Sequence, residues 1–488
     1  MDSIKQVWEK VEENLIKSRE DFAKDPSKMA EFERSVHKEF NDLERYFIAQ
    51  TFEDWDNQIR GSLKRLENWV VVRRDKKELV TMSGTVIFNK TLFKNKKDGH
   101  SEYLLDKILG IRSHERITDA SKAQILEEAV QTSYRRGGDA ACISEDKVSK
   151  EAVKDILHHL RFPNEEKPTS KKVVDYLYID ADEDHISLQF KDKKGDLEIG
   201  ENHWKNNCVL GKIVYVYEGI EPESPKNKRH RLVNPHYFCG VYDGNDNAKL
   251  WDAVYSYICD NYDISKIVKI YLNADGGSWI KGGYSRIHGI TTVLDEFHMQ
   301  KYLLKMTGHL LDSADDARSK LTGLIYKDEK AKFRKEVENI AGYAEAESKQ
   351  KKIREAGEYI LNNWDAARVR VCGEEAVKGC SAEGHVSHIL SDRMSSRPRG
   401  WSRIGADKMC HLRAYYKNGG DMLELVRYQK EEPVAAGAEC EQILSSSAML
   451  HSESNTHGLV GKYYEHMNHS LSLQTKEKIY FNSQIWLL

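Results

Sequence analysis

Apolar residues recur every three to four positions through the first stretch of the chain, as in "FERSVHKEFNDLERYFIAQTFEDW". This spacing predicts amphipathic helices over residues 1–67. The pattern then changes at about 69–94, "WVVVRRDKKELVTMSGTVIFNKTLF", to β-branched runs separated by charged residues and a Ser-Gly pair. Such runs predict a hairpin or small sheet. We therefore expect the N-terminal part to be mostly helical with one small β element.

A second helical block follows at about 102–161. In it, a helix carrying Tyr134, Arg135 and Arg136 meets a Gly-Gly break, and "SKEAV" then begins another helix. This is the outline of a helix-turn-helix, a common DNA-binding unit, with the two arginines as candidate DNA contacts. The pattern is short and common, so two packed helices with no nucleic-acid role fit it equally well.

After a polar linker at 164–172, the pattern changes to that of a sheet. "VVDYLYIDADED" reads as an apolar strand, "HISLQF" as its hairpin partner and "CVLGKIVYVYEG" as a third strand. The helical spacing of "NAKLWDAVYSYICDNYD" follows, and "ISKIVKIYLNAD" is a buried strand that ends at Asp275. This order of three strands, a helix and a strand predicts an α/β ribonuclease H-like core.

Acidic residues fall where these strands end. In open α/β sheets, ligands gather at the carboxyl ends of strands near a switch in strand order. We therefore expect Asp275 to face a carboxylate of the first strand and to hold a divalent cation that prefers oxygen, Mg²⁺ or Mn²⁺. Glu383 opens an arginine-rich amphipathic segment and is the candidate third acid. Three acids suit a pair of ions for phosphodiester chemistry.

Four ordered motifs resemble a known family. "YIDADEDHISLQ", "NADGGSWIKGG", "VLDEFHMQKYL" and "CSAEGHVSHILSDRMSSRPRGWS" are similar to the signatures of ISLre-type transposases of bacterial insertion sequences. These are DDE enzymes related to mutator-like transposases. The resemblance spans residues 75–420. It implies a ribonuclease H-like catalytic domain, an upstream DNA-binding region and a helical insertion before the Glu, for which the helical pattern of 299–371 leaves room.

The resemblance also implies roles for individual residues. The first family Asp falls in "DADED", where Asp182 fits the pattern of an acid, Ala, then Asp, while Asp180 is the alternative because it directly ends the apolar strand. The second Asp matches Asp275 and the Glu matches Glu383. The related pattern of an Asp, two residues and a His is met by Asp295 and His298, which share one face of a helix at this spacing.

Several further residues are candidates for contact with DNA. Trp279 and Lys281 lie beside the Asp275 turn, and the arginines of the Glu383 segment suit a phosphate backbone. These arginines are Arg393, Arg397, Arg399 and Arg403, with Arg413 further along. Structural alternatives stand beside these roles. Asp275 fits a turn residue, Trp279 and His298 fit core positions, and the acid of Glu383 and the arginines fit a solvated helix face.

Composition and charge narrow the class of protein. The chain has 488 residues, more than the roughly 250 to 300 that one core supports, so at least two domains are expected. A net charge of -3 means that any nucleic acid must meet a local basic patch. Eight scattered cysteines form no CxxC pair and read as reduced thiols. No apolar run is long enough to cross a membrane, which predicts a cytoplasmic protein, and the transposase resemblance implies a bacterial, nucleoid-associated one.

The predicted organisation has six parts. They are an N-terminal helical region (1–67), a hairpin plus helix-turn-helix-like DNA-binding region (68–163), the first part of the ribonuclease H-like core (173–298), a helical insertion (299–371), the end of the core with the Glu helix (372–425) and a C-terminal tail (426–488). The resemblance stops before most of this tail.

The functional expectation is a DNA transposase with two Mg²⁺ or Mn²⁺ ions. It binds the terminal inverted repeats of its element, cleaves the ends with activated water and transfers the 3′ hydroxyl strand to target DNA. A transposase holds two ends, so a homodimer or larger assembly on DNA is expected. The sequence leaves two alternatives open. One is a metal-dependent nuclease of the same fold without strand transfer, and the other is a catalytically inactive, transposase-derived DNA-binding protein.

Overall fold

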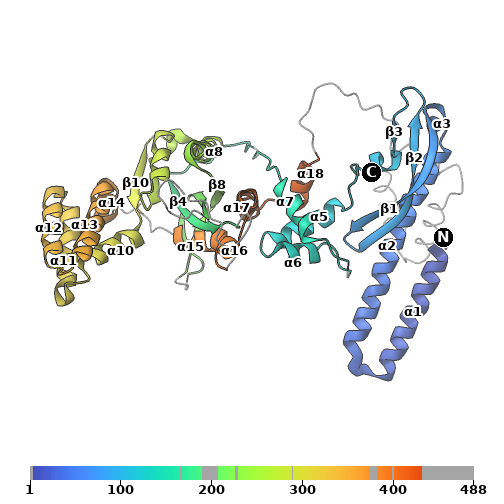
Figure 1. Ribbon diagram of the computed structural model, residues 1–488, viewed down its shortest axis with the longest axis horizontal. Coiled ribbons are helices and arrows are strands. Elements are labelled where there is room, and N and C mark those ends of the chain that lie inside the picture. Colours follow the sequence, from blue (N-terminus) through green and yellow to red (C-terminus); the bar gives the residue numbers. More distant parts are fainter. Residues whose placement is uncertain are drawn as a thin grey trace. The chain divides into compact units, whose positions relative to one another are not determined.

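The computed structural model describes residues 4–144, 146–164, 167–189, 207–225, 229–287, 289–373, 377, 382–397 and 400–430 (Figure 1). It divides into two compact units. Of the described residues, the first comprises those within 4–125 and 138–148 together with Lys430, and the second those within 126–137 and 149–429. In the described part of the chain, no helix has the length and apolar character needed to cross a membrane. The cysteines described are all free thiols.

The first unit joins a long helical hairpin to a small antiparallel sheet (Figure 1). Its elements are α1 (Ile4–Lys24), α2 (Met29–Gly61), α3 (Leu63–Asn68), β1 (Trp69–Thr81), β2 (Gly84–Asn95), β3 (Ser101–Glu102) and α4 (Leu104–Ile108). The predicted helices and hairpin are both confirmed. Phe22 stacks on Phe32 near the turn between α1 and α2, with ring centroids 4.8 Å apart. Phe88 and Phe93 of β2 lie fully buried in the core between the sheet and α2.

Carboxylates cover the free edge of β2. Strand β3 pairs with only two residues of β2, so several backbone N–H groups of β2 have no strand partner. The Glu53 carboxylate accepts the N–H of Asn89, and the Asp56 carboxylate accepts the N–H and hydroxyl of Thr91. Both acids come from α2 and are buried. These hydrogen bonds satisfy backbone N–H groups of β2 that could otherwise pair with a strand of another chain.

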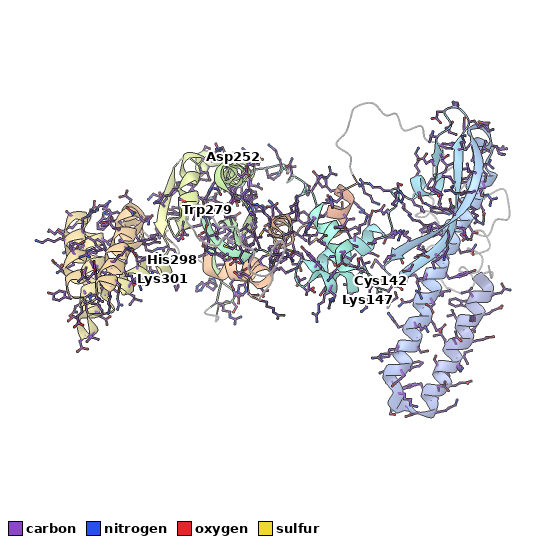
Figure 2. All side chains as sticks on the ribbon, in the orientation of Figure 1. Cys142, Lys147, Asp252, Trp279, His298 and Lys301 are labelled. Atoms are coloured by element: carbon purple, nitrogen blue, oxygen red, sulfur yellow. The ribbon has the colours of Figure 1, made fainter. Side chains whose placement is uncertain are left out.

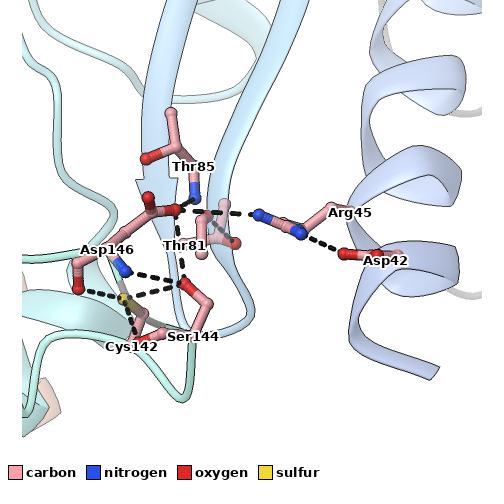
Figure 3. A network of polar contacts seen from close by, with 8 residues as sticks. Asp42, Arg45, Thr81, Thr85, Cys142, Ser144 and Asp146 are labelled. Atoms are coloured by element: carbon pink, nitrogen blue, oxygen red, sulfur yellow. Dashed lines mark hydrogen bonds and ion pairs between the residues drawn. The ribbon is translucent and has the colours of Figure 1, made fainter. Parts of the chain in front are cut away.

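A polar network fastens the loop 142–146 to the β1–β2 turn. Cys142 begins this loop and Lys147 directly follows it (Figure 2), and the contacts are drawn in Figure 3. Asp146 accepts the backbone N–H of Thr85 at 2.7 Å and pairs with Arg45 of α2 at 3.7 Å. Gly84 adopts φ of 122°, and a Cβ there would lie 2.5 Å from Ser144 Oγ. The turn therefore requires glycine.

Helices α5 (Asp119–Ala129), α6 (Tyr134–Asp139) and α7 (Lys150–His158) occupy the segment predicted to be a helix-turn-helix. Arg135 and Arg136 lie on α6 and are exposed. The predicted second helix begins where expected, because Ser149 caps α7 by accepting the N–H of Ala152. DNA binding by this segment stays a prediction.

The second unit is built on a five-stranded mixed sheet of order β10-β9-β4-β5-β8. The strands are β4 (Tyr176–Ser187), β5 (Cys208–Tyr217), β8 (His236–Val241), β9 (Lys269–Ala274) and β10 (Ile290–Leu294), with a separate β6 (Gly219–Pro222) and β7 (His230–Val233) pair. Strand β4 is antiparallel to β5 and parallel to β9, and β10 is parallel to β9. The crossover to β9 contains helix α8 (Asn247–Asn261). The chain is thus mixed α/β.

Two details of the predicted sheet were wrong. "HISLQF" is not a hairpin partner, because His185–Ser187 continues β4 without a turn. The acidic run "DADED" resembles a turn in composition, yet its residues alternate between the two sides of an extended strand. The third sheet strand is "HYFCGV", β8, which the sequence analysis did not identify. The sequence of three strands, a helix and a strand holds, with β5 and β8 as the second and third members.

The two faces of this sheet differ in chemistry. One face carries aliphatic residues such as Ile179, Val214 and Leu272, which pack with α8 in a fully buried core. The other face carries a row of tyrosines, in which Tyr178 stacks on Tyr217 and Tyr271. Helix α15 (Ala382–Val386) packs against β4, and α17 (Arg403–Lys417) packs against β8. The tyrosine face is also the face of Asp180 and Asp182.

Five helices between β10 and α15 form a second core of their own (Figure 1). They are α10 (Glu296–Thr307), α11 (Ala314–Tyr326), α12 (Lys330–Gly342), α13 (Glu347–Asn362) and α14 (Trp364–Cys372). These are the successive helices predicted for 299–371. Further short elements include α9 (Ser278–Lys281), the π-turn Ser387–Ser391, α16 (Asp392–Met394) and α18 (Met422–Tyr428).

The buried edge of β2 gives a test of the first unit. Replacing Asp56 by Ala leaves two buried donors of Thr91 without an acceptor. We expect the variant Asp56→Ala to lose about 2–4 kcal/mol of unfolding free energy. Urea denaturation measures the loss. Glu44→Ala, which removes an exposed acid of the same helix, is the control, and equal midpoints for the two variants would contradict the assigned role.

Candidate active site

The sheet register brings three aspartates to one edge. Ala181 of β4 pairs with Ala274 of β9, and Ala274 pairs with Leu294 of β10. The three strands run parallel, so the residue that follows each of these positions lies at the same level. Those residues are Asp182, Asp275 and Asp295. Asp275 and Asp295 directly follow the last residues of β9 and β10, and Asp182 lies level with them inside β4, just after its last pair with β9.

Asp180 and Asp182 have different environments although they lie on the same face of β4. Asp180 is fully buried. It accepts hydrogen bonds from the hydroxyls of Tyr215 at 2.7 Å and Tyr217 at 3.1 Å, and from Asn273 Nδ2 at 2.7 Å. Its two oxygens are thus engaged inside the sheet. This arrangement makes Asp180 a structural acid and favours Asp182 as the acid of the site.

Asp182 is only partly covered, and its surroundings disfavour its negative charge. Burial raises the pKa of Asp182 to about 6, and the nearby charge of Asp275 acts in the same direction. The hydrogen bond from the N–H of Glu183 opposes this effect. A carboxyl of raised pKa beside a second acid at a strand end is a common feature of functional sites.

Asp275 lies in a turn that the helical insertion holds. Its Oδ1 accepts the N–H of Gly277 at 2.9 Å, so the predicted turn interaction is present. Its backbone oxygen accepts the hydroxyl of Tyr359 from α13. Gly276 adopts φ of 86°, and a Cβ there would lie 2.3 Å from Asn363 Oδ1. The turn thus leaves no space for a side chain beside Asp275.

Asp295 and His298 form the third part of the edge. Asp295 is buried and caps α10 by accepting the N–H of Phe297 at 2.7 Å. His298 lies one turn later on α10, with Nδ1 3.5 Å from Asp295 Oδ2 (Figure 2). The contact with Asp295 raises the pKa of His298, and the charges of Asp275 and Asp182 add to the rise. The histidine is therefore coupled electrostatically to all three aspartates.

Glu383 lies in helix α15, whose backbone is described while the Glu383 side chain lies outside the described part of the structure. His385 of the same helix packs on Tyr215, with ring centroids 4.8 Å apart, and its Nδ1 lies 3.3 Å from the hydroxyl of Tyr237. Because Tyr215 also contacts Asp180, α15 lies on the sheet face that carries Asp180 and Asp182.

The donor set suits an oxygen-preferring divalent cation, but the described residues do not complete a site. Among the side chains that the structure describes, no three or more of His, Cys, Asp or Glu are arranged to hold a metal ion. Asp182 and Asp275 are hard oxygen donors, and burial, followed by the charge of Asp275, raises the pKa of Asp182, an effect that a bound cation would oppose. Glu383 is the acid left to complete the set.

The residues expected to contact DNA are found in several settings. Trp279 is half-buried against Trp251, whose indole N–H donates to the Trp279 carbonyl, and Lys212 Nζ lies 5.1 Å from its ring (Figure 2). Lys281 is exposed at the end of α9. Trp279 therefore packs partly in the core, the structural alternative given for it.

The arginines of the Glu383 segment differ in exposure. Arg393 is 3% exposed and donates to the carbonyl of Ala129, so it does not belong to a solvated series. Arg413 is likewise buried, donating to main-chain carbonyls. Arg403 pairs with Asp243, while Arg397 is exposed. Arg399 lies outside the described residues. The expectation of one arginine-lined face is thus wrong for Arg393 and Arg413, because their guanidinium groups satisfy buried backbone.

Sequence reasoning missed the residues that support this edge from behind. Arg370 of α14 donates to the carbonyl of Leu294 at 2.9 Å and to Asn273 Oδ1 at 3.0 Å. The side-chain amide of Asn273 in turn donates a hydrogen bond to Asp180, so Arg370 supports Asp180 through Asn273. No local pattern marks Arg370 or Tyr359, because each reaches a residue more than 70 positions away. Asn273 could have been identified from the sequence, because it is a polar residue of a predicted buried strand just before the Asp275 turn.

The contrast between the two acids of β4 can be measured. Asp180→Ala removes the acceptor of three buried donors, and we expect it to cost about 3–5 kcal/mol of unfolding free energy. In Asp182, the pKa is higher in the folded state than in the unfolded chain, so the charged form destabilises folding above about pH 6. Asp182→Asn should thus keep stability at neutral pH or raise it by up to about 3 kcal/mol.

Denaturation with EDTA present tests both variants without interference from bound cations. If Asp182→Asn destabilises as much as Asp180→Ala, the distinction between a structural acid and a site acid does not hold.

Comparison with known proteins gives the family. Residues 22–432 match an uncharacterised protein family (UPF0236). A UPF0236 protein of Caldanaerobacter subterraneus subsp. tengcongensis is 38% identical over 403 residues, covering 82% of this chain and 80% of its own length. A second from the same organism is 36% identical over 420 residues, covering 86% and 84%, and its name joins eleven gene designations. The family thus has many paralogues in one genome, and the chain described here belongs to the UPF0236 family.

Proposed function

We propose that this protein is a DNA transposase of the DDE type. The observation that carries the proposal is the alignment of Asp182, Asp275 and Asp295 at one level across three neighbouring parallel strands, with the helix of Glu383 packed against β4. The proximity of two acids of the expected set, with the helix of the third on the adjoining sheet face, supports the proposal. The strand order, with the first strand central, supports a ribonuclease H-like core.

Two further features support the proposal. The four motifs that resemble ISLre-type transposases lie at this edge and its neighbours, on β4, the Asp275 turn, the start of α10 and α15. A relative whose name joins eleven gene designations in one organism indicates a multicopy gene. Multiple copies are what a mobile element produces when its own enzyme moves it.

The residues have distinct tasks in this function. Asp182, Asp275 and Glu383 would hold the divalent ions. When bound, such ions activate an attacking oxygen and stabilise the leaving oxygen of a phosphodiester. Tyr359 bonds the backbone oxygen of Asp275 and Asn363 lies close to Gly276, so contacts from the helical insertion support the turn that carries the carboxylate. His298, whose pKa is raised by Asp295, favours its protonated form and suits a phosphate oxygen.

The same acids serve two successive phosphoryl transfers. Water attacks the phosphodiester at the element end, the P–O bond to the 3′ oxygen breaks, and the strand is left with a free 3′ hydroxyl. That hydroxyl then attacks a phosphodiester of target DNA and displaces its 3′ oxygen. Both are in-line displacements, so positioned acids and cations suffice for both.

Catalysis gives the first test. Asp275→Ala and Glu383→Ala should lower cleavage of a labelled element end by more than about 100-fold, the upper end of what loss of an indirect supporting residue costs. Affinity for the same DNA should change little. Asp312→Ala, which removes an exposed acid of the helical insertion, is the matched control. Undiminished cutting by either site variant would remove the mechanism, and absence of joined product with wild type would indicate a nuclease instead.

Cation binding gives a test that does not depend on DNA. Calorimetric titration with Mn²⁺ should give a binding heat for wild type and for Asp312→Ala. The heat should disappear in Asp275→Ala and in Asp182→Ala, because each removes an oxygen donor. A protein that only binds DNA would give the same isotherm for all four chains, and that result would contradict the proposal.

A further inference from the structure

A cavity of about 670 Å³ lies within the second unit, away from the three aspartates. The start of α6, the first turns of α7, Gln189 after β4, and the residues around Trp401 form its walls. The volume is in the range of small-molecule and nucleotide sites. The comparisons with known proteins and the proposed active site assign nothing to this cavity.

The inner wall is aromatic and firmly built. Tyr134 and Trp401 meet edge to face with ring centroids 6.0 Å apart. The buried guanidinium of Arg393 lies 4.7 Å from the Trp401 ring and 5.9 Å from the Tyr134 ring. Trp401 is itself fixed, because its indole N–H donates to the carbonyl of Met394 at 3.0 Å. Rigid aromatic surfaces of this kind suit the flat face of a base.

The rim of the cavity is cationic. Arg135, Lys150 and Lys154 line it and are exposed, and Arg393 lies in its inner wall. Glu151 is the one acid among the described lining residues. Four positive groups therefore face one negative group, although the whole chain carries a net charge of -3. An excess of cations around an aromatic wall favours a ligand that joins a flat ring to a phosphate.

A buried donor in the aromatic wall has no partner. The hydroxyl of Tyr134 is inaccessible to solvent and makes no hydrogen bond to the described residues. Burial raises the pKa of Tyr134 to about 12, so this hydroxyl keeps its proton and remains a donor. Because this hydroxyl is closed off from solvent, a ligand in the cavity would contact the ring of Tyr134 and not its hydroxyl.

The cavity connects directly to the strand that carries Asp182. Trp401 pairs with Leu188, donating to the carbonyl of Ser187 at 3.0 Å and accepting the N–H of Gln189 at 2.9 Å. Leu188 is six residues beyond Asp182, which corresponds to about 20 Å of extended strand. That length equals about six steps of duplex DNA at 3.4 Å each.

From these observations we propose that the cavity binds one nucleotide of the DNA strand on which the proposed transposase acts, with its base against Tyr134 and Trp401 and its phosphate at Arg135 and Lys154. The identification of the nucleotide as part of that strand rests on the proposed function. The nucleotide lies about six positions from the bond that is cut. The cavity thus provides a second binding site for the substrate strand, distant from the acids.

Salt-dependent binding tests the cationic rim. The probe is a fluorescent duplex from the DNA that flanks the gene for this chain, and the variant is Arg135→Glu with Lys154→Glu, both exposed and outside the core. We expect at least about a tenfold loss of affinity at low salt, and a log–log salt slope smaller by about 1, because the one phosphate contact that is lost contributes about 0.9. Lys335→Glu with Lys352→Glu, on exposed positions of the helical insertion, is the control of equal charge change.

Photocrosslinking tests the aromatic wall. 5-Iodouracil is placed at successive positions of the same duplex, and crosslinked peptides are identified by mass spectrometry. We expect crosslinks to Tyr134 or Trp401 from positions about six nucleotides from the cleaved bond, lost in the Arg135→Glu, Lys154→Glu variant and kept in the control variant.

Three results would overturn the inference. They are an absence of crosslinks to Tyr134 and Trp401, equal losses of affinity in rim and control variants, and displacement of the DNA by polyglutamate at matched charge, which would indicate an acidic protein partner. If wild type cleaves element ends and yet shows one of these results, only the inference fails. If wild type neither binds nor cleaves this DNA, the proposed function fails first.

Discussion

The buried hydrogen bonds of Asp180 are the interaction on which the second unit depends. Asp180 accepts from two tyrosines of β5 and from Asn273 of β9, so one carboxylate joins three neighbouring strands. A buried carboxylate without these donors would be costly, and a slip of one residue would turn the aspartate to the aliphatic face. The network therefore specifies the register of β4 against both neighbours. That register in turn sets Asp182 level with Asp275. Among the described hydrogen bonds and ion pairs, none joins the side chains of Asp182 and Asp275 directly.

The helical insertion is part of the same construction, although it has its own core. Tyr359 holds the Asp275 carbonyl, and Arg370 bonds Asn273 and the end of β10. Three acids at one sheet edge repel each other, and a loop at this position would relax by moving its carboxylate into solvent. Contacts from α13 and α14 oppose that movement. The insertion thus stabilises the positions of the acids at the sheet edge. This role is separate from any contact of the insertion with DNA.

The sequence predicted much of this architecture because its signals are local. The N-terminal helices, the hairpin, the helices of 299–371 and the strand that ends at Asp275 follow from periodicity and turn residues, and Asp275 lies at the predicted sheet edge. The failures are nonlocal or ambiguous. "DADEDHIS" is acidic enough to suggest a turn, yet pairing with β5 and β9 keeps it extended. The burial of Arg393 and Arg413 depends on carbonyls of Ala129 and Ile389, contributed by segments that no pattern in the arginine series reveals.

The arginines illustrate how charge is used differently within one segment. Arg393 bonds the carbonyl of Ala129 at the end of α5, and Arg413 bonds the carbonyls of His388 and Ile389 within the π-turn. Buried guanidinium groups can do this because five donors fan out in a plane and satisfy more than one carbonyl. Exposed Arg397 and Arg135 have no such task in the described structure. A basic surface for nucleic acid therefore has to be assembled from α6, α7 and the exposed part of the Glu383 segment. The number of arginines in the sequence overestimates the positive charge of this surface, because Arg393 and Arg413 are buried and bond main-chain carbonyls.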